Sequence, residues 1–323
     1  MTMFKYVLKR IGLAIMVFLI SSTISFTLIR QLMPPFEAAE GGFEYTIEAA
    51  RRAALGFDRP IPVQLWRYVR SIITEGDFGV SWQINLMMPV TEMIAHRLPP
   101  TMLLSVYSMV VAIPFGIMLG IWAAVKKNKP TDHIISTSIM LFISVPNFVV
   151  AFFMQYFLGF RLGWFPVVVS SHFEAGSTWF SWTMIHSMIL PVLALSFGTI
   201  AGFARTTRAE LTEELTRDYM LLARSKGLTR PSAIRRHALR NALVPVFPGI
   251  LGAFFGIVSG SIIIEQIFAV GGMGPLLLQS IGTVDYDVFI VVTMFYLSIG
   301  LVSMIVGDMS LGVIDPRIRM GER

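Results

Sequence analysis

Six long runs of apolar residues divide this chain, with shorter polar segments between them. The runs span about 10–30, 101–124, 133–157, 186–207, 243–266 and 288–311. Each is close to the roughly 20 apolar residues that an α-helix needs to cross the hydrocarbon core of a bilayer. Helices of soluble proteins alternate polar and apolar faces, whereas these runs are apolar all round. The pattern therefore predicts an all-α polytopic membrane protein with six transmembrane helices.

The composition supports the same interpretation. The chain has 323 residues, of which 54% are hydrophobic and only 14% charged, whereas a soluble domain carries roughly 25% charged residues. The first apolar run is longer than the core of a signal peptide and no small-residue cleavage site follows it, so we expect a retained span. The sequence contains no cysteine, which excludes disulfides and thiolate metal sites.

The distribution of positive charge predicts the topology. Eighteen of the 26 lysines and arginines lie before the first run and after the second, fourth and sixth. Cytoplasmic loops of membrane proteins carry such an excess of basic residues. We therefore expect a multi-pass protein of the cytoplasmic membrane with both termini in the cytoplasm. The long segment at about 31–100 then lies outside, where two short amphipathic helices are predicted at Thr46–Leu55 and Val63–Ile73; it is either a solvated cap or a docking surface.

Motifs of the common catalytic chemistries are absent. The sequence has no G-x-x-x-x-G-K-[ST] phosphate loop, no H-E-x-x-H and no G-x-S-x-G. Its five histidines are scattered without the spacing of metal ligands. Glu265 lies near the outer end of the fifth run, where solvation at the membrane interface is the favoured interpretation. We expect no catalytic residue and no metal site. An intramembrane enzyme or an ion-coupled carrier needs clustered ionisable groups at membrane depth, so both are disfavoured alternatives.

A basic segment, Arg217–Pro245, connects the fourth and fifth runs. A short helix is predicted at about 218–227, because Asp218 suits its first turn, Lys226 its last turn, and Gly227 the left-handed position that ends a helix. Thr229 is placed to begin a second helix with Pro231 in its first turn. Tyr219, Leu222 and Ala223 share one face of the short helix at helical spacing. Such a helix can enter the groove of a partner protein, and Ala223 is then expected to lie against that partner. A basic loop held near anionic lipid is the simpler alternative.

Glycines recur at four-residue spacing in two of the runs. This spacing places small residues on one helix face and allows another helix to approach closely. Packing within this chain and packing against a second, similar subunit remain open alternatives. The glycines are Gly116 and Gly120 in the second run, and Gly252, Gly256 and Gly260 in the fifth, with Gly249 three residues before Gly252.

The sequence ARSKG followed by RRHALRNALVP resembles the cytoplasmic-loop signature of ABC importer permeases. It is most similar to the dipeptide, oligopeptide and nickel branch, as are the segments Gly56–Ser71, Gly76–Trp82 and Arg97–Ser105. The chain departs from the family pattern at Leu32–Gly42 and Phe268–Gly274. The resemblance implies the type I ABC importer permease fold. It also implies an ATPase-coupling helix formed by Asp218, Tyr219, Leu222, Ala223, Arg224, Lys226 and Gly227, and a loop motif formed by His237, Arg240, Asn241 and Pro245.

The resemblance further implies a set of partners. These are a second homologous permease, two cytoplasmic ATP-binding subunits that hold ATP and magnesium, and an extracytoplasmic substrate-binding protein, all beside membrane lipid. No cofactor in this chain and no nucleic-acid partner are expected. The implied organisation is a first helix plus external segment at 1–98, a transmembrane domain at 99–311 and a cytoplasmic tail at 312–323. The implied function is ATP-driven import of peptides, with nickel or another small solute as the alternative.

Overall fold

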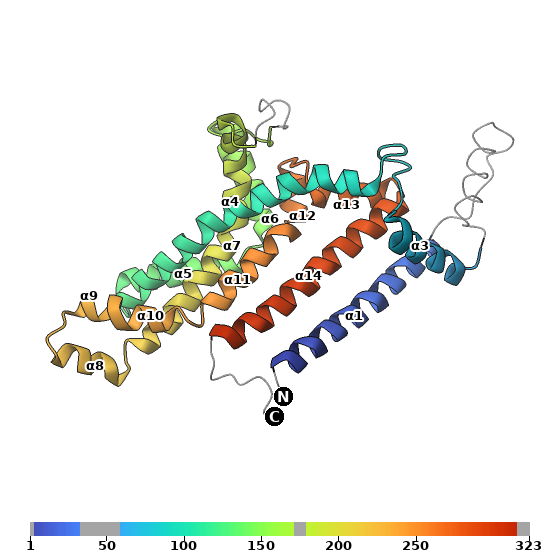
Figure 1. The fold of residues 1–323 in the computed structure, drawn as a ribbon. Helices are drawn as coiled ribbons and strands as arrows, with labels where there is room; N and C mark the ends of the chain where they lie inside the picture. The colour runs from blue at the N-terminus through green and yellow to red at the C-terminus, as the bar shows by residue number, and fades with distance from the viewer. Residues whose placement is uncertain (1–2, 33–58, 171–178, 315–323) are drawn as a thin grey trace. The chain divides into compact units, whose positions relative to one another are not determined.

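The computed structural model describes residues 3–32, 59–170 and 179–314. Within these ranges the chain is almost entirely helical, apart from loops and an isolated bridge between Val80 and Pro89 (Figure 1). The predicted helix at Thr46–Leu55 lies outside the described residues, as do residues 33–42 and the final segment 315–323. The predicted all-α architecture is confirmed for the described part.

The chain divides into two compact units. One is formed by residues 97–276 with 302–323, and the other by residues 2–96 with 277–301. The helices of the first unit begin in α4 (Val90–Val125) and continue through α5 (Pro130–Ser144), α6 (Asn147–Met154), the π-helical turn η1 (Gln155–Arg161) and α7 (Trp182–Glu214). There follow α8 (Asp218–Ser225), α9 (Arg230–Ala233), the π-helical η2 (Ile234–Ala238), α10 (Leu239–Ala242), α11 (Phe247–Phe255), the 3₁₀ turn η3 (Gly256–Ser259) and α12 (Ile262–Ile267). Helix α13 (Met273–Gly282) begins in the first unit and ends in the second.

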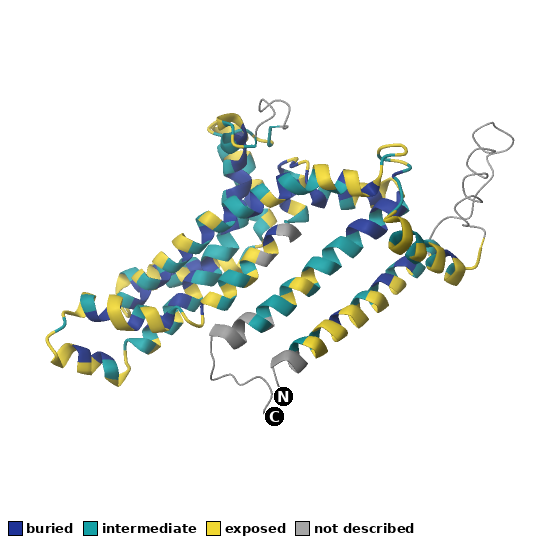
Figure 2. Ribbon diagram, viewed as in Figure 1, coloured by how far each residue is buried: buried dark blue, intermediate teal, exposed yellow. Residues whose placement is uncertain are grey.

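Helix α7 is the central helix of the first unit. Helices α5, α6, α10 and α12 all pack on it, and 56% of its most apolar window is buried. Figure 2 shows buried positions along much of α7. Its largest buried side chains include Met184, Met188 and Leu190, which pack with Leu104 of α4 and Phe268. A helix buried on several sides explains why this run shows no polar face in the sequence.

The second unit contains α1 (Met3–Leu32), α3 (Ile61–Glu75) and the first half of α14 (Tyr286–Ile314). The rings of Phe26 and Tyr68 stack at 5.5 Å between α1 and α3. Burial raises the pKa of the Tyr68 phenol. Arg30, at the end of α1, forms an ion pair with Asp287 at 3.2 Å. The predicted helix at Val63–Ile73 corresponds to α3.

The number of spans is less simple than the hydropathy pattern. Among the described residues, four helices are long and apolar enough to cross a bilayer: Val7–Gln31, Val90–Val125, Trp182–Glu214 and Tyr286–Gly307. A fifth span results if α5 and the α6–η1 helix are counted together, although they meet at 99°. The break precedes Pro146, because proline disfavours helical geometry in the residue before it. The four or five spans found among the described residues are consistent with the predicted six, and the number six itself stays a prediction.

The predicted fifth run, 243–266, is not one continuous helix. It divides into α11, η3 and α12, with a non-helical break at Gly260 and Ser261. Gly260 has φ of 57°, in the left-handed region that glycine adopts without steric cost. The expectation that Gly249 to Gly260 share one helix face is corrected accordingly, because the helix ends before Gly260.

Candidate coupling site

Helix α8 matches the short helix predicted from the basic segment. It begins at Asp218 after an extended Arg217, whose side chain makes no capping hydrogen bond, and it ends at Ser225. Gly227 has φ of 89°. The Gly227 amide donates to the Arg224 carbonyl at 3.0 Å, and the Leu228 amide donates to the Ala223 carbonyl at 3.2 Å. These two bonds form the Schellman arrangement, so Gly227 ends the helix in the position that the sequence predicts.

The two faces of α8 have different surroundings. Met220 and Ala223 are buried against the chain's own apolar side chains, including Ala233, Ile234 and Ala238. Leu221 and Leu222, in contrast, are 66% and 56% exposed. Asp218, Arg224, Lys226 and Gly227 are exposed with them.

This arrangement corrects part of the sequence interpretation. Tyr219, Leu222 and Ala223 were expected to share one face, with Ala223 against a partner. Ala223 instead lies in the core of its own loop, because the small-residue positions Ala233, Ala238 and Ala242 form a surface that receives it. Leu221 was not singled out from the sequence. Because Met220 is buried, the helical periodicity places Leu221 and Leu222 on the exposed side of α8.

Tyr219 connects three elements of the segment. Its hydroxyl donates to the carboxylate of Glu214 at the end of α7, and it also forms a hydrogen bond with the side chain of Asn241 in α10. Burial, followed by the hydrogen bond to Glu214, raises the pKa of the Tyr219 phenol. Glu213 next to it pairs with Arg217. The structure thus brings together Tyr219 and Asn241, which the sequence analysis had assigned to separate halves of the motif.

The returning half of the segment is helical but irregular. Thr229 precedes α9 as predicted, with Pro231 in the first turn, but its hydroxyl donates to Ser232 at 3.1 Å and caps no backbone amide. His237 lies in η2, and Arg240 in α10; both side chains are exposed, as is Pro245 before α11. The exposed basic groups and the buried alanines Ala238 and Ala242 alternate around this part of the chain.

An ion pair joins α5 to α7 and was not found by sequence reasoning. Arg208 donates from Nε and Nη2 to the two carboxylate oxygens of Asp132 at 2.6 and 2.9 Å. The same carboxylate accepts from the Asn128 amide at 2.9 Å and from the Ser136 hydroxyl at 3.2 Å. Asp132 is buried, and its bidentate geometry fixes the first turn of α5 on α7, six residues before α7 ends.

The predicted packing glycines fall into two groups. A Cβ added at Gly120 would lie 2.6 Å from the Ala204 carbonyl oxygen, and one at Gly116 would lie 2.7 Å from the Cβ of Phe203. Both glycines therefore allow α4 to approach α7 closely. Gly249 has only ordinary contacts with Phe203, and no atom of the described chain lies within 4 Å of a Cβ at Gly252 or Gly256.

Glu265 differs from its predicted environment. It was expected at a solvated interface, but it is fully buried. Its carboxylate accepts from the Thr101 hydroxyl at 3.1 Å, the Gly274 amide at 2.9 Å and the Ser261 amide at 3.3 Å. Gly274 lies in the segment Phe268–Gly274, where the chain departs from the family pattern. The glycines at 272 and 274 leave room for the carboxylate.

A second buried carboxylate organises the segment Gly76–Trp82 in the other unit. Asp285 Oδ2 accepts from the Ser81 hydroxyl at 2.6 Å and from the backbone amides of Trp82, Gln83 and Ile84 at 3.0–3.2 Å. Asp287 accepts from the Trp82 indole at 3.1 Å. The sequence analysis recognised this segment but not its partners, which lie about 200 residues later. Among the residues that the structure describes, no group of three or more potential metal ligands gathers.

Comparison with known proteins identifies a matching family and full-length relatives. A family model described as the binding-protein-dependent transport system inner membrane component matches residues 116–320, and a model of the N-terminal part of such components matches residues 3–105. The chain is 34% identical to the dipeptide transport system permease protein DppB of Lactococcus lactis, over 98% of this chain and 100% of the relative. It is 35% identical to the glutathione transport system permease protein GsiC of Salmonella typhi, over 98% and 99%.

Solved structures share the fold. A chain of the inward-facing MetNI methionine ABC transporter superposes with a TM-score of 0.54 at 16% identity, covering 70% of this chain and 97% of that chain. A chain of an amino acid ABC transporter superposes with a TM-score of 0.50 at 17% identity, covering 68% and 94%. These similarities confirm the predicted importer-permease fold. By its family matches and its full-length relatives, the chain belongs to the binding-protein-dependent transport system inner membrane components.

Proposed function

We propose that this chain is one permease subunit of an ATP-driven importer for peptides. The observation that carries the proposal is α8, a short helix whose exposed side presents Leu221 and Leu222 beside the charges of Arg224 and Lys226. Exposed leucines on a capped helix are suited to a partner's apolar groove. The names of the relatives, which include dipeptide, glutathione and peptide permeases, support peptides as the substrate.

The contacts around α8 suggest how motion passes from the ATPases to the spans. The ATP-binding subunits hold ATP and magnesium, and their closure displaces α8. The buried cluster around Ala223, together with the Tyr219 bonds to Glu214 and Asn241, makes α8 move with the end of α7 and with α10. The Asp132–Arg208 pair then carries the movement to α5. The result is alternating access between this chain and a second, homologous permease, with cargo supplied by an external binding protein.

The proposed organisation follows the charge pattern. Residues 1–98 supply the first helix and the external segment, 99–311 the transmembrane domain, and 312–323 a cytoplasmic tail. Both termini and α8 lie in the cytoplasm, because the basic residues concentrate at alternate ends of the spans. Single cysteines at Lys127 and Ser225 should be labelled by a membrane-impermeant thiol reagent only from the cytoplasmic side, and one at Ser71 only from outside. A reversed pattern contradicts this topology.

Reconstitution tests the function directly. The chain is purified with its second permease and two ATPases, placed in proteoliposomes with the binding protein, and supplied with a radiolabelled dipeptide. We expect uptake that requires both ATP and the binding protein, and no ATP turnover by the single chain alone. Uptake of Ni²⁺ without uptake of dipeptide would overturn the peptide assignment. Robust ATP turnover by the isolated chain would overturn the assignment of hydrolysis to separate subunits.

A further inference from the structure

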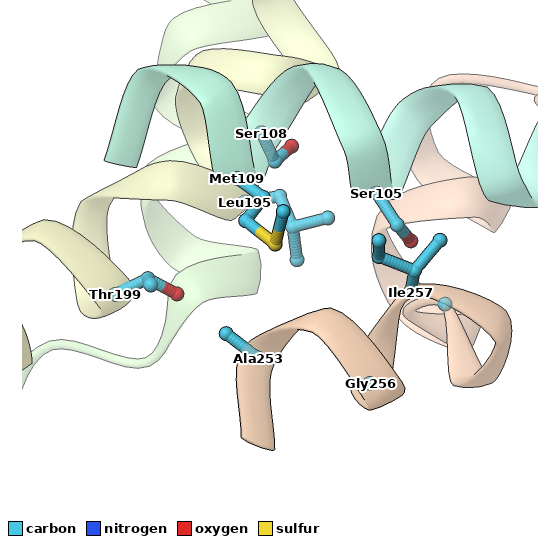
Figure 3. Close-up of a pocket in the computed structure, with 9 residues that line it drawn as sticks. Ser105, Ser108, Met109, Leu195, Thr199, Ala253, Gly256 and Ile257 are labelled. Atoms are coloured by element: carbon cyan, nitrogen blue, oxygen red, sulfur yellow. The ribbon is translucent and has the colours of Figure 1, made fainter. Parts of the chain in front are cut away.

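A cavity of about 160 Å³ opens within the unit formed by residues 97–276. Figure 3 shows that three elements line it: α4 on one side, α7 beside it, and the α11–η3 segment opposite. The lining residues are Ser105, Ser108, Met109, Leu195, Thr199, Ala253, Gly256, Ile257 and Gly260. The cavity therefore lies where the predicted fifth span faces the second and fourth.

The helix that faces this cavity is interrupted beside it. Helix α11 ends at Phe255, a 3₁₀ turn follows, and the chain leaves helical geometry at Gly260 before α12 begins. In a bilayer, irregular backbone is tolerated only where protein covers it or where it lines a cavity. Interrupted membrane helices recur at the solute sites of transporters, because their unpaired backbone groups can bind a solute. The break and the cavity occupy the same place here.

The lining offers hydrogen bonds but no charge. Among the described residues, the hydroxyls of Ser105 and Thr199 have no hydrogen-bond partner, whereas the Ser108 hydroxyl donates to the Val192 carbonyl at 3.3 Å. Both free hydroxyls can donate to and accept from a solute. The remaining side chains that line the cavity are apolar.

A nearby carboxylate does not change this character. A Cβ at Gly260 would meet Glu265 and Thr101, so Gly260 lies directly against the buried acid. The Glu265 carboxylate is already held by Thr101, Ser261 and Gly274 and has no exposed surface. The cavity thus reaches the Glu265 carboxylate only through the backbone of Gly260.

The size of the cavity limits what it holds. Pockets for whole drug-sized ligands measure about 300–1,000 Å³, whereas a single water needs only about 10–15 Å³. A space of about 160 Å³ therefore takes several waters or one residue-sized part of a larger solute.

We infer that this cavity is a solute-binding subsite on the translocation pathway. It takes one uncharged amino-acid unit of a peptide: a peptide group that bonds to the Ser105 and Thr199 hydroxyls and a small apolar side chain against Met109, Leu195 and Ile257. The inference rests on the proposed peptide-import function and adds to it the place in this chain where the peptide is held.

Thiol accessibility tests the inference, and the absence of native cysteine makes the chain suited to it. Met109→Cys places a thiol in the cavity lining. Val110→Cys is the matched control, because Val110 is the next residue of α4, is 63% exposed and does not line the cavity. Both variants are prepared in the complete complex with cysteine-free partners and treated with a positively charged methanethiosulfonate reagent, with and without a neutral dipeptide and the binding protein.

We expect Met109→Cys to react at least tenfold faster than Val110→Cys, because a thiol ionises in a hydrated cavity and not against lipid or protein. The dipeptide should slow the reaction, and the modified Met109→Cys complex should lose dipeptide uptake. Equal reactivity of the two variants would overturn the inference, and so would unchanged uptake after complete modification.

A second measurement concerns the hydroxyls. Ser105→Ala should lower dipeptide uptake severalfold at equal membrane abundance, whereas Ser144→Ala, which removes a hydroxyl bonded to the Met140 carbonyl in α5, should not. Unchanged uptake by Ser105→Ala would refute the role of this hydroxyl. If the wild-type complex imports no peptide, the proposed function fails; if it does import peptide but the Met109 and Ser105 variants behave like their controls, only the subsite fails.

Discussion

Two adjacent positions of α8 should respond to the same substitution through different mechanisms. Ala223 is 6% exposed and lies in the chain's own apolar cluster, whereas Leu222 is 56% exposed. Ala223→Asp and Leu222→Asp both place a carboxylate on α8, one turned inward and the other outward. The first is expected to open the segment locally, and the second is expected to leave the segment folded but to weaken ATPase docking.

The magnitudes follow from burial. A buried polar group without a hydrogen-bond partner costs about 1–3 kcal/mol, and inserting extra atoms into a packed core costs about 1–3 kcal/mol more. Ala223→Asp should therefore destabilise the closed segment by at least about 2 kcal/mol, which raises its open population roughly 30-fold at 1.4 kcal/mol per factor of ten. Substitution at the exposed Leu222 should cost no more than about 1 kcal/mol, from surface and helix-propensity effects, or roughly fivefold.

Limited proteolysis measures this difference. Arg224 lies inside α8, and a protease binds its substrate as extended chain, so tryptic cleavage there reports the open population when opening is fast. The assay uses inside-out vesicles that contain the permease pair without its ATPases. Ala223→Asp should be cleaved at least about 30-fold faster than wild type, and Leu222→Asp at most about fivefold faster. In the complete complex, both should lose ATPase retention and substrate uptake.

The result that would refute this reasoning is specific. If Ala223→Asp is cleaved at the wild-type rate, Ala223 does not belong to the core of the segment. If Leu222→Asp keeps normal ATPase retention and uptake, the exposed face of α8 is not the docking surface, and the segment is a solvated basic loop.

Four further substitutions test other parts of the structure. Gly227→Val should uncouple uptake while membrane insertion stays normal, because φ of 89° disfavours a β-branched residue by about 1–3 kcal/mol; normal uptake would exclude a coupling role for this helix end. Gly120→Ala should lower the thermal stability of the purified complex, at a cost of about 1–3 kcal/mol, because its Cβ would lie 2.6 Å from the Ala204 carbonyl oxygen. A Cβ at Gly252 would have no described residue outside its own helix within 4 Å, so a loss of assembly by Gly252→Ala would identify contact with a second subunit. Asp132→Asn should weaken the bidentate bond from Arg208 by about 1.5–3 kcal/mol, less where Arg208 recovers solvent contact, and reduce uptake more than ATPase retention; equal losses would indicate a purely structural pair.

The helices were predictable because their signals are local. The end of α8 depends on Gly227 and its near neighbours, and the apolar runs specify α4 and α7 through their own composition. The break before Pro146 also has a local cause, although the hydropathy pattern treated 133–157 as one run. Features that depend on a few consecutive residues can be derived from those residues alone.

The long-range pairs were not predictable in this way. Asp132 and Arg208 lie 76 residues apart, and Ser81 and Asp285 lie 204 apart. Nothing in the local pattern around Asp132 distinguishes a buried ion pair from a charge solvated at a helix start. Similarly, the depth of Glu265 along its run indicated a solvated group, whereas the turn at Gly272–Gly274 folds back over it and supplies one donor, and the distant Thr101 supplies another.

The glycine motifs show why identical spacing can have different consequences. Gly116 and Gly120 lie in an unbroken helix, so their shared face meets α7 along two turns. Because neither residue has a side chain, α7 packs directly against the α4 backbone there. Gly252 and Gly256 have the same spacing, but α11 ends beside them and the chain there curves around a cavity. The described residues therefore leave the space beside these two glycines unfilled. A four-residue glycine repeat therefore specifies only that backbone is uncovered on one face. Whether another helix, a second subunit or a solute occupies that face depends on the continuity of the helix, which the spacing does not encode.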